Sequence, residues 1–122
     1  MKIAIPVDKT SLQSKVSLYF GRAPYFLVYD PQSKEGLFVD NDAVASTEGA
    51  GIKAAQTIVD HEVKTLLVPR LGANGAKLLK AAGVEIYKTI DASVEDNIDA
   101  FLAGELHSLT EIHPGFHGRG GN

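Results

Sequence analysis

The stretch that decides the fold is Val16-Ser-Leu-Tyr-Phe-Gly-Arg-Ala-Pro-Tyr-Phe-Leu-Val-Tyr-Asp30. It joins a Phe-Gly-Arg turn at residues 20–22 to an apolar and aromatic run from Tyr25 to Asp30. Such a run, rich in aromatic and branched side chains and followed by Pro31, is typical of a buried strand. We therefore expect a strand over 25–30 that is entered through a tight turn.

Further strand signals lie on both sides of this stretch. Upstream, Ile3–Val7 is a short apolar run that predicts a central strand, and the polar residues 8–18 predict a loop after it. Downstream, a turn through Ser33 to Gly36 leads to a strand over Leu37–Asp40. The strands over 25–30 and 37–40 are expected to form a hairpin.

The second half of the chain alternates helices with strands. Apolar spacing predicts a helix from about residue 52 to 61, a strand over 65–68, a helix that follows Gly72–Gly75 and a strand over 84–87. It also predicts a last helix that begins within Ser93–Asp96 and is closed by Gly104. Ser93-Val-Glu-Asp96 is a capping sequence for the last helix. Strand–helix–strand alternation implies right-handed crossovers and parallel pairing, so the sequence predicts an α/β fold.

Composition excludes several classes of protein. The chain has 122 residues, of which 44% are hydrophobic, and a net charge of -3, so we expect one soluble domain without a general affinity for nucleic acid. No segment approaches the roughly 18 apolar residues of a membrane span. The N-terminus leads directly into a core strand instead of a signal peptide, so the expected location is cytoplasmic.

The absence of cysteine is a stronger constraint. It excludes disulfides, cysteine nucleophiles and thiolate ligands for zinc or for an iron–sulfur cluster. A bound metal cluster would therefore be held by imidazole, carboxylate, backbone amides or its own exchangeable ligands. Such binding is transient, which suits a carrier better than a redox enzyme.

Several motifs occur in the order found in one known family. They are Lys2-Ile-Ala-Ile-Pro-Val-Asp8, Phe20-Gly-Arg-Ala-Pro-Tyr-Phe26, Gly49-Ala-Gly-Ile-Lys-Ala-Ala55, Arg70-Leu-Gly-Ala-Asn74 and Ala82-Gly-Val-Glu-Ile-Tyr87. Over residues 1–104 the chain resembles the proteins that bind the dinitrogenase iron–molybdenum cofactor or its cluster precursors. The resemblance implies a small accessory or carrier protein and not an enzyme. Residues 105–122 contain Gly, His and Pro without clear periodicity, so we expect a partly disordered C-terminal tail there.

The resemblance also implies the architecture. The expected fold is a three-layer ribonuclease H-like α/β fold, with a five-stranded mixed sheet in the order 3-2-1-4-5, an antiparallel second strand and helices on both faces. Four strands would then end at one edge of the sheet, where the second strand begins. Open α/β sheets bind ligands at this carboxyl edge. The segments expected to converge there are Asp8–Ser14, Leu18–Arg22, Asp42–Gly51, Pro69–Asn74 and Lys88–Asp91.

Two predicted helices begin at this edge, after Gly49-Ala-Gly51 and after Leu71-Gly-Ala-Asn-Gly75. Free amides at a helix N-terminus, aided by the helix dipole, favour anions. Arginines in neighbouring segments add positive charge, so the edge suits a phosphate, a carboxylate or an anionic cluster. The candidate binding residues are Asp8, Tyr19, Phe20, Gly21, Arg22, Gly49, Gly51, Arg70, Gly72 and Asn74.

Structural roles are the alternative for several of these residues. The glycines suit tight strand-to-helix turns, and neither group matches a dinucleotide or Walker loop. Arg22 could instead pair with Asp8 or Asp42, and Lys53 is expected to be a solvated surface residue. Tyr19 takes the position where the resembling family often has histidine.

The phenol of Tyr19 is a poor ligand for a reduced or sulfur-rich cluster. The alternative is that the ring packs over the turn with its hydroxyl in water. Direct ligation at this position is therefore in doubt, but recognition of an anion by Arg22 and backbone amides does not depend on it.

The histidines offer a second place for a metal. His61 ends a predicted helix, where the dipole favours a cation, which is a structural role. His113 and His117 are separated by Pro114-Gly115, which prevents a helical pair of ligands. A flexible histidine tail binds nickel, copper or zinc weakly, so these two residues are the candidate metal ligands.

The leading hypothesis is a non-enzymatic carrier for an iron–sulfur or iron–molybdenum-type cluster, with cluster-assembly or nitrogenase-type proteins as partners. The alternative is a small anion- or metabolite-binding regulatory module that uses the same edge. A metal-dependent nuclease ranks third: Asp8 follows the first strand, but the several clustered carboxylates that such an enzyme needs are not placed on neighbouring strands.

Overall fold

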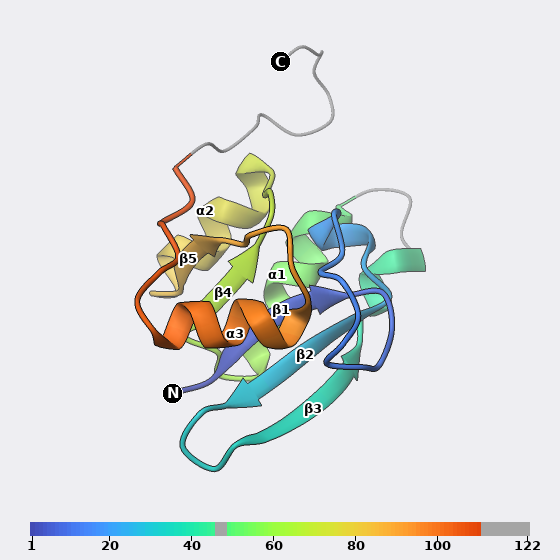
Figure 1. The fold of residues 1–122 in the computed structure, drawn as a ribbon. Coiled ribbons are helices and arrows are strands. Elements are labelled where there is room, and N and C mark those ends of the chain that lie inside the picture. The colour runs from blue at the N-terminus through green and yellow to red at the C-terminus, as the bar shows by residue number, and fades with distance from the viewer. Residues whose placement is uncertain (46–48, 111–122) are drawn as a thin grey trace.

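Five strands form one mixed sheet in the computed structural model, which describes residues 1–45 and 49–110 (Figure 1). In chain order they are β1 (Ile3–Val7), β2 (Tyr25–Asp30), β3 (Glu35–Asp40), β4 (Thr65–Val68) and β5 (Glu85–Lys88). Their order across the sheet is β3-β2-β1-β4-β5, and β2 is antiparallel to both of its neighbours. The predicted order and the antiparallel second strand are confirmed, while the ribonuclease H-like designation stays a prediction.

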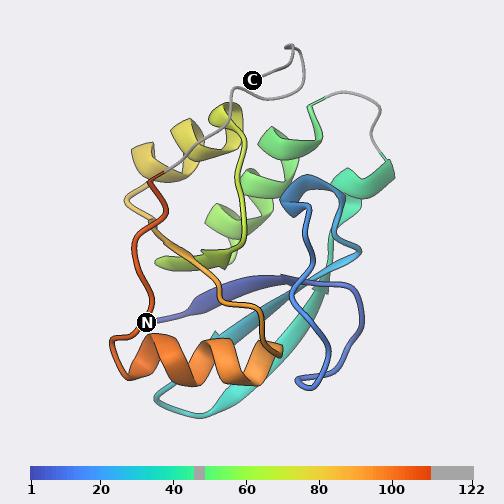
Figure 2. The ribbon, with the colours of Figure 1, turned by 45° about the horizontal axis from the view of Figure 1, so that its top comes forward.

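Helices cover both faces of the sheet (Figure 2). On one face lie α1 (Ala50–Asp60) and α2 (Ala73–Ala81), and on the other lies α3 (Val94–Leu102). Successive side chains of a strand point to opposite faces, so β1 contributes Ala4 to the core under α1 and α2 and Ile5 to the core under α3. Burial on both faces explains why β1 is apolar throughout.

Several elements differ in their bounds from the sequence prediction, and α2 begins at Ala73 instead of after Gly75. β3 begins at Glu35 because the non-glycine residue Lys34 completes the turn with a φ of 61° and donates its N–H to the Asp30 carbonyl at 2.8 Å. α1 begins at Ala50, and β5 is shifted to 85–88. Two 3₁₀ helices were not predicted: η1 (Phe20–Arg22) and η2 (Asp42–Ala45).

The chain after α3 covers the outer edge of β5. Leu106 and Leu109 are buried, and Ser108 forms a β-bridge with Tyr87. The folded unit therefore continues to Leu109, beyond the predicted boundary at residue 104. No helix in the described parts of the chain is long and apolar enough to cross a membrane.

All three α-helices end with a residue in the left-handed conformation. At α2 and α3 this residue is Gly83 and Gly104, with φ angles of 79° and 76°. At α1 it is Glu62, with a φ of 60°, whose N–H donates to the Val59 carbonyl at 2.9 Å. A side chain in this conformation costs about 1 kcal/mol, which glycine avoids.

Replacing Glu62 by glycine is therefore expected to stabilise the protein. We predict that Glu62→Gly raises the free energy of unfolding by about 1 kcal/mol and the melting temperature by roughly 4 °C, measured by thermal and urea denaturation. The matched control is Glu62→Gln, which removes the charge but keeps a side chain. An equal gain in Glu62→Gln would show that charge, and not backbone conformation, sets the cost.

Candidate functional site

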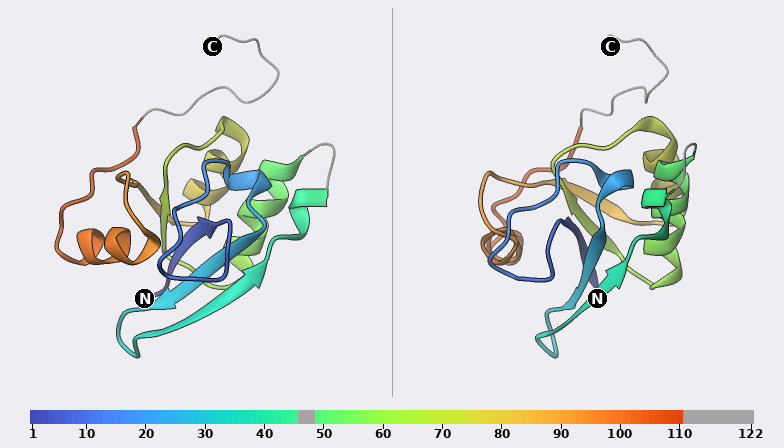
Figure 3. Two further views of the ribbon diagram at one scale, coloured as in Figure 1. Left: turned by 45° about the vertical axis from the view of Figure 1, so that its right-hand side comes forward. Right: turned by 90° about the vertical axis from the view of Figure 1, so that its right-hand side faces the viewer.

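The described residues of the five segments that were predicted to meet lie at the carboxyl edge of the sheet. Val7 at the end of β1 pairs with Tyr25 at the start of β2, and Tyr25 pairs with Asp40 at the end of β3. β4 and β5 run parallel to β1, so they end at the same edge. Figure 3 shows the loops that follow these strands gathered at this end of the molecule.

A buried asparagine holds the first of these loops. The Nδ2 of Asn41 donates to the carbonyl oxygens of Ala23, at 2.8 Å, and Gly21, at 3.3 Å. Its Oδ1 accepts the N–H of Ala43 at 3.1 Å, and the residue is 1% exposed. Asn41 therefore ties η1 to η2. It was missed as a site residue, and its only sequence signal is a polar residue directly after a strand.

The start of α1 is packed between η1 and α2. A Cβ on Gly21 would lie 3.1 Å from the backbone nitrogen of Gly51 and 3.2 Å from the carbonyl carbon of Ala50. A Cβ on Gly75 would lie 3.2 Å from the carbonyl oxygen of Gly51. Gly21 and Gly75 thus permit close backbone contact, whereas a Cβ on Gly51 itself would meet nothing within 4 Å. Of the predicted binding glycines, Gly51 borders open space and Gly21 is a packing residue.

An aromatic–cation contact joins two of the converging segments. The Cζ of Arg70, in the loop before α2, lies 5.6 Å from the ring centroid of Tyr19, which precedes η1. Tyr19 is 56% exposed, and Arg70 is exposed as well. An exposed contact of this kind contributes about 0.5–1 kcal/mol. Tyr19 therefore holds the guanidinium of Arg70 beside the 20–22 turn.

The remaining predicted residues divide into exposed and buried. Phe20 is 5% exposed and packs against Phe26 with ring centroids 5.2 Å apart, so its side chain supports the turn from the core. The exposed members are Asp8 in the loop after β1, Arg22 in η1 and Asn74 in the first turn of α2.

The N-terminal ends of α1 and α2 both lack a side-chain cap. Gly49, with a φ of 70°, precedes α1, and Gly72, in extended conformation, precedes α2. Neither glycine has a side chain that could accept from the first amides of its helix. These ends lie beside η1 and Arg70, which is the part of the edge best suited to an anion.

The N-terminus of α3 is different, because its amides already have partners. Val94 N–H donates to the Ser14 carbonyl at 2.9 Å, and Glu95 N–H donates to the Leu12 carbonyl at 3.0 Å. Ser93 Oγ accepts from the Asp96 amide at 3.0 Å, as its capping sequence predicts. This half of the edge is closed by the loop 8–18.

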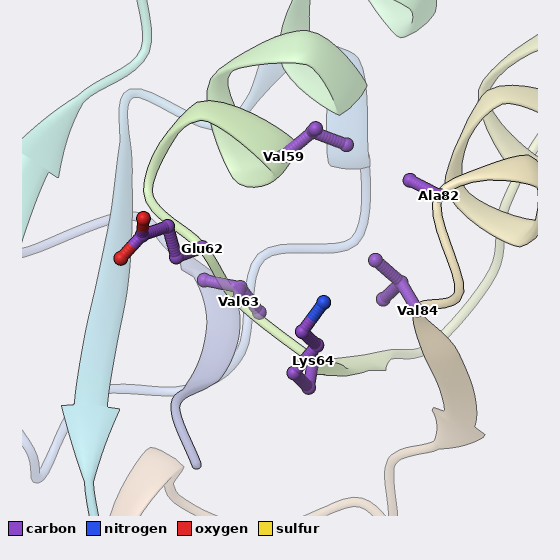
Figure 4. A pocket seen from close by; sticks show the side chains of 6 residues that line it. All are labelled: Val59, Glu62, Val63, Lys64, Ala82 and Val84. Atoms are coloured by element: carbon purple, nitrogen blue, oxygen red, sulfur yellow. The ribbon is translucent and has the colours of Figure 1, made fainter.

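A hollow of about 390 Å³ lies at the opposite edge of the sheet, between the carboxyl ends of α1 and α2 (Figure 4). Its walls combine valine and alanine side chains with polar groups, and the ammonium of Lys64 is directed into it. It contains none of the predicted site residues. It is lined by Val59, Glu62, Val63, Lys64, Ala82 and Val84.

The described residues contain no cluster of three or more His, Asp or Glu side chains that could hold a metal ion. His113 and His117 lie outside the described residues. The edge therefore offers guanidinium groups and backbone amides, which fit an anion that carries its own coordination sphere. They do not form a ligand set for a bare metal ion.

One pKa is displaced at the surface of β5. The hydroxyl of Tyr87 donates to Glu85 Oε1 at 3.1 Å, and this hydrogen bond to a carboxylate raises the pKa of the phenol above its ordinary value. The pair favours the folded state below pH 10, and its contribution is lost as the pH rises through the raised pKa. It belongs to the strand surface and not to the α1–α2 part of the edge.

Fold and edge together define a class of small α/β proteins in which loops gather at one edge of a five-stranded mixed sheet. The chain belongs to the dinitrogenase iron–molybdenum cofactor family, whose model matches residues 1–104.

Two solved structures and one curated sequence illustrate the similarity. The apo form of the orange protein from Desulfovibrio gigas is 30% identical with a TM-score of 0.84, and the match covers 88% of this chain and 92% of that chain. A Thermotoga protein provisionally identified as NifB is 38% identical with a TM-score of 0.81, covering 93% and 97%. The uncharacterized protein MJ0580 of Methanocaldococcus jannaschii is 28% identical, covering 89% and 92%.

Replacement of Gly21 and of Gly51 by alanine is expected to change the free energy of unfolding in opposite directions. Gly21→Ala is expected to lower the free energy of unfolding by about 1–3 kcal/mol, because the new methyl group meets backbone atoms that cannot move aside. Gly51→Ala is expected to raise it by about 0.5–1 kcal/mol, because the methyl group enters open space and favours the helix. Urea denaturation measures both, and a neutral Gly21→Ala would contradict the close contact between η1 and α1.

Proposed function

We propose that this protein is a non-enzymatic carrier that binds an anionic iron–sulfur or iron–molybdenum-type cluster at the carboxyl edge during cofactor assembly. Membership in the dinitrogenase iron–molybdenum cofactor family supports the proposal, as does the similarity to the orange protein and to the NifB-type protein. Its partners in this role are cluster-assembly or nitrogenase-type proteins. The observation that carries the proposal is that two uncapped helix N-termini lie next to Arg70 and the 20–22 turn.

The chemistry of the edge suits a cluster that keeps its own ligands. Amides at the starts of α1 and α2 and the guanidinium groups of Arg22 and Arg70 donate hydrogen bonds to an anion without bonding to a metal. With no cysteine in the chain, no protein thiolate has to be displaced when the cluster leaves. Rapid release is what a carrier requires.

Tyr19 has a supporting part in this proposal. The guanidinium of Arg70 lies over the ring of Tyr19. In this proposal Tyr19, which replaces the histidine frequent in the family, orients a cation and does not ligate a metal. Asn41 supports the other arginine, because it fixes the carbonyl groups on both sides of Arg22.

The test is an anaerobic titration with a preformed iron–molybdenum–sulfide cluster, followed by charge-transfer absorbance. We expect the double variant Arg22→Ala/Arg70→Ala to bind at least about tenfold more weakly, because two charge-assisted contacts are lost. The matched control is Lys77→Ala/Lys80→Ala, which removes the same charge from exposed positions further along α2. Circular dichroism establishes that both variants are folded.

Two results would contradict the proposal. Unchanged binding in the arginine variant would place the cluster elsewhere, and an equal loss in the lysine variant would show that only net charge matters. Thermal-shift assays test the alternative, a module for small anions or metabolites. Stabilisation by a sugar phosphate or nucleotide, with none by the cluster, would favour that module.

A further inference from the structure

The two outer edges of the sheet differ in whether another segment of the chain covers them. The edge at β5 is covered by residues 106–109, whose backbone donates to and accepts from the strand: Lys88 N–H donates to the His107 carbonyl at 2.8 Å, and Leu109 N–H donates to the Ile86 carbonyl at 3.0 Å. The other edge is β3, and within residues 1–45 and 49–110 no segment pairs with its outer side (Figure 1). An uncovered edge strand is a template for another strand.

The hydrogen bonds of the hairpin indicate which groups of β3 point outward. Asn41 N–H donates to the Pro24 carbonyl at 3.0 Å, which makes that pair a hydrogen-bonded one in the register that continues β2 and β3. Hydrogen-bonded and non-hydrogen-bonded pairs alternate along an antiparallel ladder. Gly36, Phe38 and Asp40 therefore direct their backbone N–H and C=O groups away from β2.

The side chains of this edge are apolar in the middle and charged at the ends. Leu37 is 60% exposed, although it lies in the centre of a six-residue strand. Lys34 and Asp40 flank it and are both exposed. An apolar centre between opposite charges is self-complementary when a strand pairs antiparallel with its own copy.

We propose that β3 pairs antiparallel with β3 of a second copy of this chain, about a two-fold axis at Leu37. In this register Leu37 faces Leu37 of the second copy, and Gly36 and Phe38 exchange backbone hydrogen bonds across the interface. Lys34, the turn residue directly before β3, then lies near Asp40 of the second copy, and the two-fold axis repeats this ion pair. The two five-stranded sheets become one continuous sheet.

Because hydrogen-bonded and non-hydrogen-bonded pairs alternate along the ladder, the register that would place two carboxylates opposite each other cannot form. Outward-facing residues must oppose outward-facing residues, so Glu35 cannot lie opposite Asp40 of the second copy. A register centred on Gly36 places Lys34 opposite an aromatic side chain. One centred on Phe38 places Lys34 beyond the end of the partner strand. Of these registers, only the one centred on Leu37 pairs the apolar centre with itself and brings Lys34, the turn residue directly before β3, next to Asp40 of the second copy.

This pairing leaves the proposed ligand site open. The strands of the two copies run in opposite directions, so their carboxyl edges lie on opposite sides of the combined sheet. Loss of the dimer would therefore leave cluster binding intact. A negative result for the dimer does not count against the cluster site, and a negative result for cluster binding does not count against the dimer. One strand from each copy buries less than a standard stable interface, so the association is expected to be weak and to need trapping.

The absence of native cysteine makes covalent trapping specific. Cα atoms of a non-hydrogen-bonded pair lie about 4.5 Å apart, within the range that a disulfide spans. Under mild oxidation we expect Leu37→Cys to form a covalent dimer by itself. Glu35→Cys should not, but a mixture of Glu35→Cys with Val39→Cys should, since these positions face one another in the proposed register.

Leu102→Cys is the matched control, because this exposed leucine lies on α3, away from β3. The proposal is overturned if Leu37→Cys forms no more covalent dimer than Leu102→Cys. It is also overturned if Glu35→Cys dimerises alone as readily as in the mixture, because that would indicate random collision.

The second test measures the dimer dissociation constant of the protein without introduced cysteines by sedimentation equilibrium. Asp40→Lys is expected to raise the dimer dissociation constant about fivefold, and the charge swap Lys34→Asp/Asp40→Lys is expected to restore it. A protein that stays monomeric at millimolar concentration would overturn the proposal, as would a swap that fails to restore association.

Discussion

The carboxyl edge of this protein depends on the buried carboxamide of Asn41. Its nitrogen and oxygen bind three backbone groups of η1, η2 and the residues beside them. Leaving a buried amide without partners costs about 1–3 kcal/mol, so the loops are held where these bonds can form. Gly21 of η1 lies close to the start of α1, and Gly51 of α1 lies close to Gly75 of α2, so these contacts connect Asn41 to both helix N-termini.

A second buried asparagine orders the other half of the edge. Asn97 accepts the N–H of Ile90 at 2.8 Å, and its amide nitrogen donates to carbonyl groups of the loop before α3, including Ser93 at 2.9 Å. The N-terminus of α3 is closed by the loop 8–18, while the helices on the other face begin without side-chain caps. This asymmetry is the reason for proposing the anion site at α1 and α2, and family membership is the reason for proposing a cluster as the anion.

Local patterns predicted most of the fold but little of the site's construction. Apolar runs placed β1, β2 and β4 at their observed bounds, and the Ser93 cap placed the start of α3, because burial and capping depend on neighbouring residues. The strand order came from family resemblance, since element order alone permits several sheets. Phe20 shares a motif with Arg22 yet packs in the core. The role of Asn41 was not predictable, because its partners lie about 20 residues away and meet it only in the folded sheet.

Amide hydrogen exchange at Arg22 tests most directly whether Asn41 builds the edge. The N–H of Arg22 donates to the Tyr19 carbonyl at 3.2 Å within η1. In Asn41→Ala we predict that exchange at Arg22 accelerates by at least about tenfold relative to Leu66 in β4, because the turn opens locally while the central sheet stays closed. Equal exchange at Arg22 in the two proteins would contradict the account, since η1 would then hold its position without the asparagine.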